Sequence, residues 1–202
     1  NTADRAGLAS YLVTGETFDT NGYGLFAVGN YTTYANVDNL GKIDGFGTVK
    51  QSITKGESQR IDDTGAWMPT GSYVTTSNNN IYGSLVSQIT VGESYNRIYV
   101  NTADRAGLAS YLVTGETFDA NGYGLFAVGN YTTYANVDNL GKIDGFGTVK
   151  QSITKGESRR VDDTGAWMAT GAYVTTSNNN IYGSLVSQIT VGESYNRIYV
   201  NT

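Results

Sequence analysis

The chain consists of two nearly identical copies of a 100-residue sequence that follow one another without a gap. The second copy begins at Asn101, and the last two residues of the chain repeat the opening once more. The copies differ only at Thr20/Ala120, Gln59/Arg159, Ile61/Val161, Pro69/Ala169 and Ser72/Ala172. A repeat of this kind constrains the fold strongly, because every unit must pack on itself or on its neighbour in the same way. No low-complexity linker separates the copies, so we expect them to abut directly.

Runs of β-branched and aromatic residues alternate with turn residues throughout each copy. Residues 31–37 and 95–100 are such runs, and they are typical of strands. Asn21-Gly22 and Asp44-Gly45 are dipeptides that supply the positive φ angle of a turn. Glycine recurs every few residues and interrupts every helical pattern. The sequence therefore predicts an all-β fold with many short strands, arranged as small antiparallel barrels or sandwiches in tandem.

A second, weaker repeat lies inside each copy. Residues 46–58 align without gaps on residues 82–94, with six of 13 positions identical. We therefore expect two related β subunits in each 100-residue copy. In this division, residues 1–13 end a preceding subunit. Residues 14–113 form the first full repeat, with subunits of about 14–74 and 75–113. Residues 114–202 form a second repeat that lacks its last strands.

The subunit pattern resembles the bacterial SH3-like modules of the SH3b and GW types, which occur in cell-surface and secreted proteins. The matching residues are Gly47-Thr-Val49, Ile53, Gly56, Gly65-Ala-Trp67 and Ser72-Tyr73-Val74 in the first subunit, and Gly83-Ser-Leu85, Ile89, Gly92, Gly107-Leu108 and Ser110-Tyr111-Leu112 in the second. The resemblance implies small barrels closed by the last segment of each set, and binding to the cell wall. The net charge of −5 would repel the polyanionic lipoteichoic acid that basic GW modules hold, so a neutral glycan or peptidoglycan fits better.

The composition excludes several classes of function. The chain has no cysteine and no histidine, so it has no disulfide, thiolate ligand, cysteine nucleophile or imidazole acid–base group. Its pI near 4.6 opposes nucleic-acid binding, which usually needs a basic face. No apolar run approaches the length of a membrane span, about 18 residues. We expect a protein that is not an enzyme and has no cofactor, no bound metal, no nucleic-acid partner and no membrane insertion.

The acidic residues do not form a diagnostic site. The segment from Asp19 partly matches a calcium loop, but its twelfth position is Asn30 rather than an acidic ligand. We expect Asp19 to cap its own turn instead. Glu16, Glu57 and Glu93 are the candidates for a pair of carboxylates that could hydrolyse glycosides. Glu57 and Glu93 occupy equivalent positions inside Ile-Thr-x-Gly-Glu-Ser, which we interpret as a connection between a strand and a turn.

The aromatic residues are the strongest candidates for ligand binding. The chain contains 16 tyrosines and two tryptophans, and aromatic rings give large contact areas with few rotors to order. The candidate glycan-binding residues are Trp67, Tyr31, Tyr34 and Tyr73, with Trp167, Tyr131, Tyr134 and Tyr173 in the second copy. The alternative for each ring is cross-strand packing, which is usual for aromatic residues in β proteins.

Two hypotheses about function follow. In the first, the chain is a non-catalytic unit of the stalk or fibre of a long extracellular or cell-surface protein, and its partners are neighbouring repeats or further chains joined side by side or end to end. In the second, it is a module of a secreted protein or glucan-active enzyme that binds cell-wall or other polysaccharides, and the repetition supplies avidity.

Overall fold

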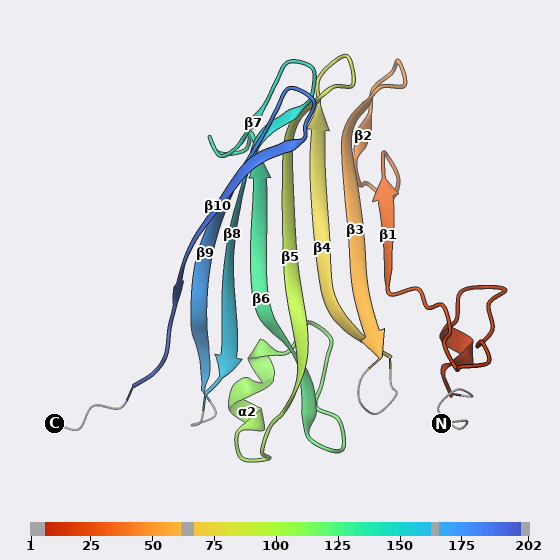
Figure 1. The fold of residues 1–202 in the computed structure, drawn as a ribbon, viewed down its shortest axis with the longest axis vertical. Helices are drawn as coiled ribbons and strands as arrows, with labels where there is room; N and C mark the ends of the chain where they lie inside the picture. The colour runs from red at the N-terminus through yellow and green to blue at the C-terminus, as the bar shows by residue number, and fades with distance from the viewer. Residues whose placement is uncertain (1–6, 62–66, 163–165, 199–202) are drawn as a thin grey trace.

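The computed structural model describes residues 7–61, 67–162 and 166–198. These residues form one antiparallel sheet of ten strands (Figure 1). Eight strands follow one another across the sheet in the order β1-β3-β4-β5-β6-β8-β9-β10, while β2 pairs with β3 and β7 with β8. The strands are β1 Gly29–Tyr34, β2 Lys42–Ile43, β3 Val49–Ile61, β4 Trp67–Asn79, β5 Leu85–Tyr99, β6 Tyr123–Ala135, β7 Lys142–Ile143, β8 Val149–Val161, β9 Trp167–Asn179 and β10 Leu185–Ser194.

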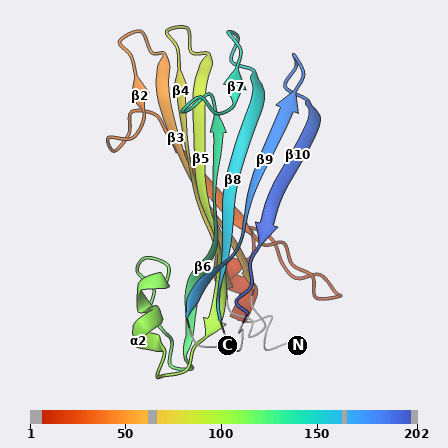
Figure 2. The same ribbon diagram turned by 90° about the vertical axis from the view of Figure 1, so that its left-hand side faces the viewer.

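The predicted all-β class is confirmed, but the arrangement in separate barrels or sandwiches is not what the described residues adopt. Strands of both copies belong to a single open sheet whose edges are β1 and β10. Figure 2 shows these strands crossing near their lower ends and spreading apart toward their upper ends, as strands of a strongly twisted sheet do. The local sequence pattern of a strand is the same in an open sheet and in a barrel, so alternation alone could not distinguish them.

The strands are also longer than the short strands that the sequence predicts. They continue through several glycines instead of ending at them. Gly56 is in the middle of β3 and Gly92 in the middle of β5, and these strands have 13 and 15 residues. A side chain on Gly56 would meet the Tyr73 ring of β4, since an added Cβ would lie 2.4 Å from it. The Ile-Thr-x-Gly-Glu-Ser segments therefore continue as strands, and the interpretation of Glu57 and Glu93 as strand–turn residues is wrong.

The turns agree with the sequence in part. Asn21-Gly22 forms the predicted turn, with φ of 90° at Gly22. Asp19 caps it as expected, since its Oδ1 accepts hydrogen bonds from the backbone N–H groups of Asn21 and Tyr23. In the other predicted turn the positive φ lies at Gly47 instead of Gly45.

The turns before β3 and β5 have the same construction. Oδ1 of Asp44 accepts from the N–H groups of Phe46 and Thr48, and Oδ1 of Asn80 accepts in the same way from residues 82 and 84. The hydrogen bond from Thr48, with those from Phe46 and Lys50, keeps the pKa of Asp44 below its usual value. Residues 46–58 and 82–94 thus share a turn followed by a strand, and their strands flank β4 on its two sides. The division into two subunits remains a prediction.

A small core lies at the lower end of the sheet, beside the short helices α2 (Arg105–Leu108) and η2 (Ala109–Tyr111). The short helix η1 (Ala9–Tyr11) lies near the N-terminus, apart from α2 (Figure 1). The SH3-like pattern predicts that residues 107–112 form a closing strand. Residues 107–111 instead belong to α2 and η2, and Leu112 makes a single bridge to Phe126. Leu108, Val100 and Phe126 are buried together, and Phe126 is 0% exposed. The helical turn therefore covers the lower sheet rather than extending it.

Candidate interaction surfaces

The two copies meet at the contact between β5 of the first copy and β6 of the second. Their antiparallel register runs from Gln88 opposite Ala135 to Tyr99 opposite Tyr123. This ladder is longer than the one between β4 and β5 inside the first copy, which runs from Gly71 to Asn79 on β4. Beyond the part of β6 that pairs with β8, the lower halves of β5 and β6 continue as a two-stranded ribbon. The copies are therefore joined by a full strand ladder.

An ion pair stabilises the lower end of this junction. Arg97 of β5 donates to the Asp119 carboxylate, and its guanidinium lies 4.8 Å from the centre of the Tyr123 ring. The hydrogen bond from Arg97, together with that from the Tyr123 N–H, keeps the pKa of Asp119 below its usual value. Because both side chains are about one-third exposed, solvent screens the pair and its contribution to stability is small.

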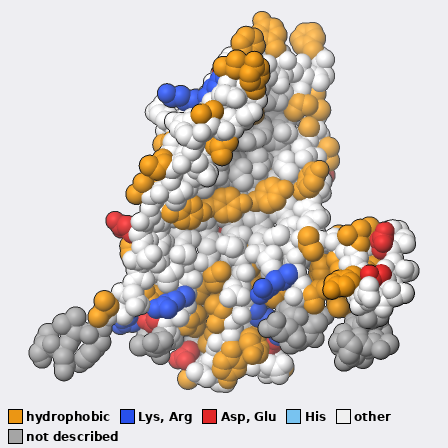
Figure 3. Space-filling model, in the orientation of Figure 1, with side chains coloured by type: hydrophobic (Ala, Val, Ile, Leu, Met, Phe, Trp, Pro, Cys, Tyr) orange, Lys and Arg blue, Asp and Glu red, His pale blue; other side chains and the backbone are white. Residues whose placement is uncertain are grey.

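One face of the sheet carries a row in which tyrosine and glycine alternate from strand to strand. The register places Tyr31, Gly56, Tyr73, Gly92, Tyr131, Gly156, Tyr173 and Gly192 in this order. The rings of the last three tyrosines cover the glycine of the preceding strand in the row, where an added Cβ would lie 2.3–2.4 Å from the ring. A band of hydrophobic side chains crosses the sheet at this level in Figure 3.

A threonine row next to the tyrosines joins neighbouring strands by side-chain hydrogen bonds. Thr33 bonds Thr54 at 2.9 Å and Thr75 bonds Thr90 at 2.8 Å, and the second copy repeats both contacts. None of the described polar or charged residues is buried, and of the six buried hydrophobic residues only Ala135 lies in the upper sheet. Cross-strand pairs, rather than a second layer, therefore hold the upper sheet together.

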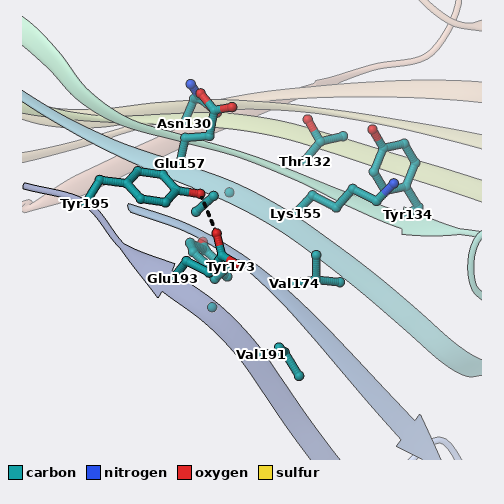
Figure 4. A pocket seen from close by; sticks show the side chains of 13 residues that line it. Asn130, Thr132, Tyr134, Lys155, Glu157, Tyr173, Val174, Val191, Glu193 and Tyr195 are labelled. Atoms are coloured by element: carbon teal, nitrogen blue, oxygen red, sulfur yellow. Dashed lines mark hydrogen bonds between the residues drawn. The ribbon is translucent and has the colours of Figure 1, made fainter. Parts of the chain in front are cut away.

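The opposite face contains a shallow groove in each copy. The groove of the first copy has a volume of about 390 Å³ and is lined by Asn30, Tyr34, Lys55 and Glu57. Its counterpart in the second copy has a volume of about 470 Å³ (Figure 4). The Lys155 ammonium lies 5.8 Å from the centre of the Tyr134 ring, as Lys55 does from Tyr34. The grooves present carboxylates, an ammonium and hydroxyl groups at intervals of one repeat.

The eight predicted glycan-binding residues lie in three separate places. Both tryptophans lie at the lower end of the sheet: Trp167 stacks on the buried Phe126 of the core at 5.4 Å, whereas Trp67 stacks on the partly exposed Tyr11 at 5.6 Å. Residues Tyr31, Tyr73, Tyr131 and Tyr173 belong to the tyrosine row on one face. Residues Tyr34 and Tyr134 belong to the grooves on the other face. Tyr73 and Tyr173 also contribute to the linings of these grooves, so the structure brings two predicted residues together in each groove but does not bring all eight into one site.

The candidate carboxylates Glu57 and Glu93 lie on the groove face, on either side of Ser72. The Ser72 hydroxyl and the Tyr95 hydroxyl are 2.6 Å apart, and Tyr95 also donates to Glu93. Burial is the main cause that raises the pKa of Tyr95. The second copy has Ala172 in place of the serine, so only the hydrogen bond from Tyr195 to Glu193 is repeated there.

Two further features concern metal ions and membranes. Within the described ranges, no group of three or more acidic side chains is placed to hold a metal ion. No helix in that part of the chain is long and apolar enough to cross a membrane.

No family model, curated protein or solved structure matches this chain.

Proposed function

We propose that this chain is a structural, non-catalytic repeat that builds an extended β-sheet in an extracellular stalk or fibre. The observation that carries the proposal is the ladder between β5 and β6, which joins the copies as closely as strands are joined inside a copy. The tyrosine row crosses this junction without interruption, and Thr90 lies opposite Thr133 across it. A repeat that contributes strands to a common sheet lengthens it by a fixed step, which is what a stalk or fibre needs.

Chains with one, two, three and four copies test this proposal. Each added copy contributes four long strands to the sheet, so the sheet should widen by about 19 Å per copy while its extent along the strands stays constant. Small-angle scattering and negative-stain electron microscopy measure both dimensions. Separate globular units would add about 30 Å per copy instead, joined like beads, and that result would end the proposal.

Polysaccharide binding is the second candidate, and the recurring grooves favour it. Hydroxyl, amide and carboxylate groups beside Tyr34 and Tyr134 could bind a chain of sugars that runs across the strands. Titration calorimetry with peptidoglycan fragments and α-glucans tests this idea on the natural chain and on a Tyr34→Ala/Tyr134→Ala variant. Binding that the double variant loses would support it, whereas no heat from the natural chain at millimolar sugar would exclude it.

A further inference from the structure

The two edges of the sheet are copies of the two strands that already pair at its centre. Residues 185–198 have the same sequence as residues 85–98, which form most of β5, and residues 23–35 have the same sequence as residues 123–135, which form β6. We propose that β10 of one molecule pairs antiparallel with β1 of a second copy of this chain, in the register of the β5·β6 ladder. The inference rests on the proposed function and specifies how the sheet continues between molecules.

The edge near the N-terminus resembles β6 deprived of its partner. In the second copy the strand begins at Tyr123, whereas in the first copy it begins only at Gly29. Leu125 is 8% exposed against β5, and its counterpart Leu25 is 57% exposed. The difference arises from the missing strand, because the sequences are the same. Pairing with a second molecule would bury this surface and extend β1 by residues 23–28.

The other edge shows the same incompleteness. Strand β10 ends at Ser194, whereas β5 continues to Tyr99. Every residue of β10 is exposed. Ile198 is 77% exposed, while Ile98 packs against the core of the junction. Both edges are therefore frayed at the end where the β5·β6 ribbon is formed, and each lacks the strand that the other provides.

Neither edge carries the features that usually block strand addition. Lysine, arginine and proline are absent from β1 and from β10, although natural proteins commonly place such residues on exposed edges. The only charged residue on these strands, Glu193, would lie opposite Asn30, as Glu93 lies opposite Asn130 in the chain. Figure 1 shows the two edges on opposite sides of the sheet, so they face outward to different neighbours.

The central tyrosine row gives the register of the new contact. In the β5·β6 ladder the Tyr131 ring covers Gly92. The equivalent pair between molecules is Tyr31 with Gly192, and both residues are available in the single chain. Tyr31 is 72% exposed, and an added Cβ at Gly192 would meet no ring, its nearest neighbour being the Ala172 carbonyl oxygen at 3.0 Å. In this register Thr190 lies opposite Thr33, as Thr90 lies opposite Thr133.

Cysteine cross-linking tests the register directly, because the chain has no cysteine of its own. Opposite residues in an antiparallel pair have Cα atoms about 4.5–5.5 Å apart, which suits a disulfide. The Thr33→Cys/Thr190→Cys variant should give a ladder of covalent dimers, trimers and longer species on a non-reducing gel. The Ala35→Cys/Thr190→Cys variant, displaced by two residues, should give a ladder weaker by about tenfold or more.

One further variant separates the outcomes. Thr90→Cys/Thr133→Cys places the same pair inside one chain and should form a disulfide in the monomer. If that control forms while the 33/190 variant stays monomeric at high concentration, the inference is overturned and the proposed function stands. If the control does not form, the proposed function itself fails. A 33–190 disulfide within single molecules would mean that the sheet closes on itself, and this also overturns the inference.

A glycine substitution at the edge provides an independent readout. Gly192→Ala should leave the stability of the single chain nearly unchanged, because no ring covers this glycine. The added methyl group should nevertheless collide with Tyr31 of the second molecule and reduce the cross-linked ladder of the 33/190 variant by about tenfold. An unchanged ladder would contradict the proposed register.

Discussion

The Phe126→Ala variant should lose about 3–5 kcal/mol of its free energy of unfolding, the usual cost of removing a fully buried phenylalanine. Phe126 is 0% exposed and contacts Trp167, Val100 and Leu108 at the junction between the copies. The described part of the chain has few other buried hydrophobic residues to compensate for the loss. Urea unfolding followed by tryptophan fluorescence measures the effect, since Trp167 stacks directly on this ring.

The equivalent residue of the first copy is the matched control. Phe26 also contacts a tryptophan, Trp67 at 5.8 Å, but it lies beside an edge strand and is only partly buried. The Phe26→Ala variant should therefore lose about 1–2 kcal/mol. Equal losses for the two variants would show that the junction adds no burial, which would contradict the structure.

The Gly92→Ala variant should lose about 1–3 kcal/mol, the usual cost of overpacking. The new methyl group would lie 2.3 Å from a carbon of the Tyr131 ring, so the ring must leave its place over β5. The row of tyrosines would then be broken at the boundary between the copies. Denaturant unfolding of the dilute monomer measures the loss.

Gly192→Ala changes the same sequence position in the second copy and serves as its control. No ring covers Gly192, and β10 is an exposed edge strand that can move slightly to accommodate a methyl group. The expected change is within about 0.5 kcal/mol of zero. If both glycine variants were equally unstable, the cost would come from the backbone and not from the tyrosine above Gly92.

Local structure was the most predictable part of the fold. Residues 95–99 of the predicted run 95–100 form the lower part of β5, and Asn21-Gly22 makes a turn capped by Asp19. These features depend on neighbours in the sequence. The shared pattern of residues 46–58 and 82–94 likewise corresponds to two turns of the same construction. Turn chemistry and alternation act over a few residues, so sequence patterns detect them.

The open sheet could not be predicted in this way. Gly56 and Gly92 look like strand breakers until the register places a tyrosine from the next strand above each of them. That contact joins residues 17 positions apart in one case and 39 in the other, and no local pattern records it. If each glycine is taken as a turn, the long strands divide into short ones, and many short strands favour a barrel or sandwich.

The candidate site shows the same limit. Composition identified tyrosine and tryptophan as the important side chains, but whether Trp67 stacks on Tyr11 or lies open depends on the tertiary fold. The sequence does not indicate the sheet edges as interaction surfaces. A strand is an edge only because no neighbouring strand pairs with it in the folded sheet. The difference in exposed fraction between Leu25 and Leu125 in the structure identifies the edge.

The pairing of strands across the boundary between the copies is the central claim, and one disulfide tests it most directly. Cysteines at positions 90 and 133 face each other only if β5 and β6 pair in the observed register. Mild oxidation of the dilute Thr90→Cys/Thr133→Cys chain should give a monomer with an internal disulfide, which raises its resistance to urea. A chain that keeps both thiols free, or cross-links only between molecules, would show that the two copies do not share one sheet.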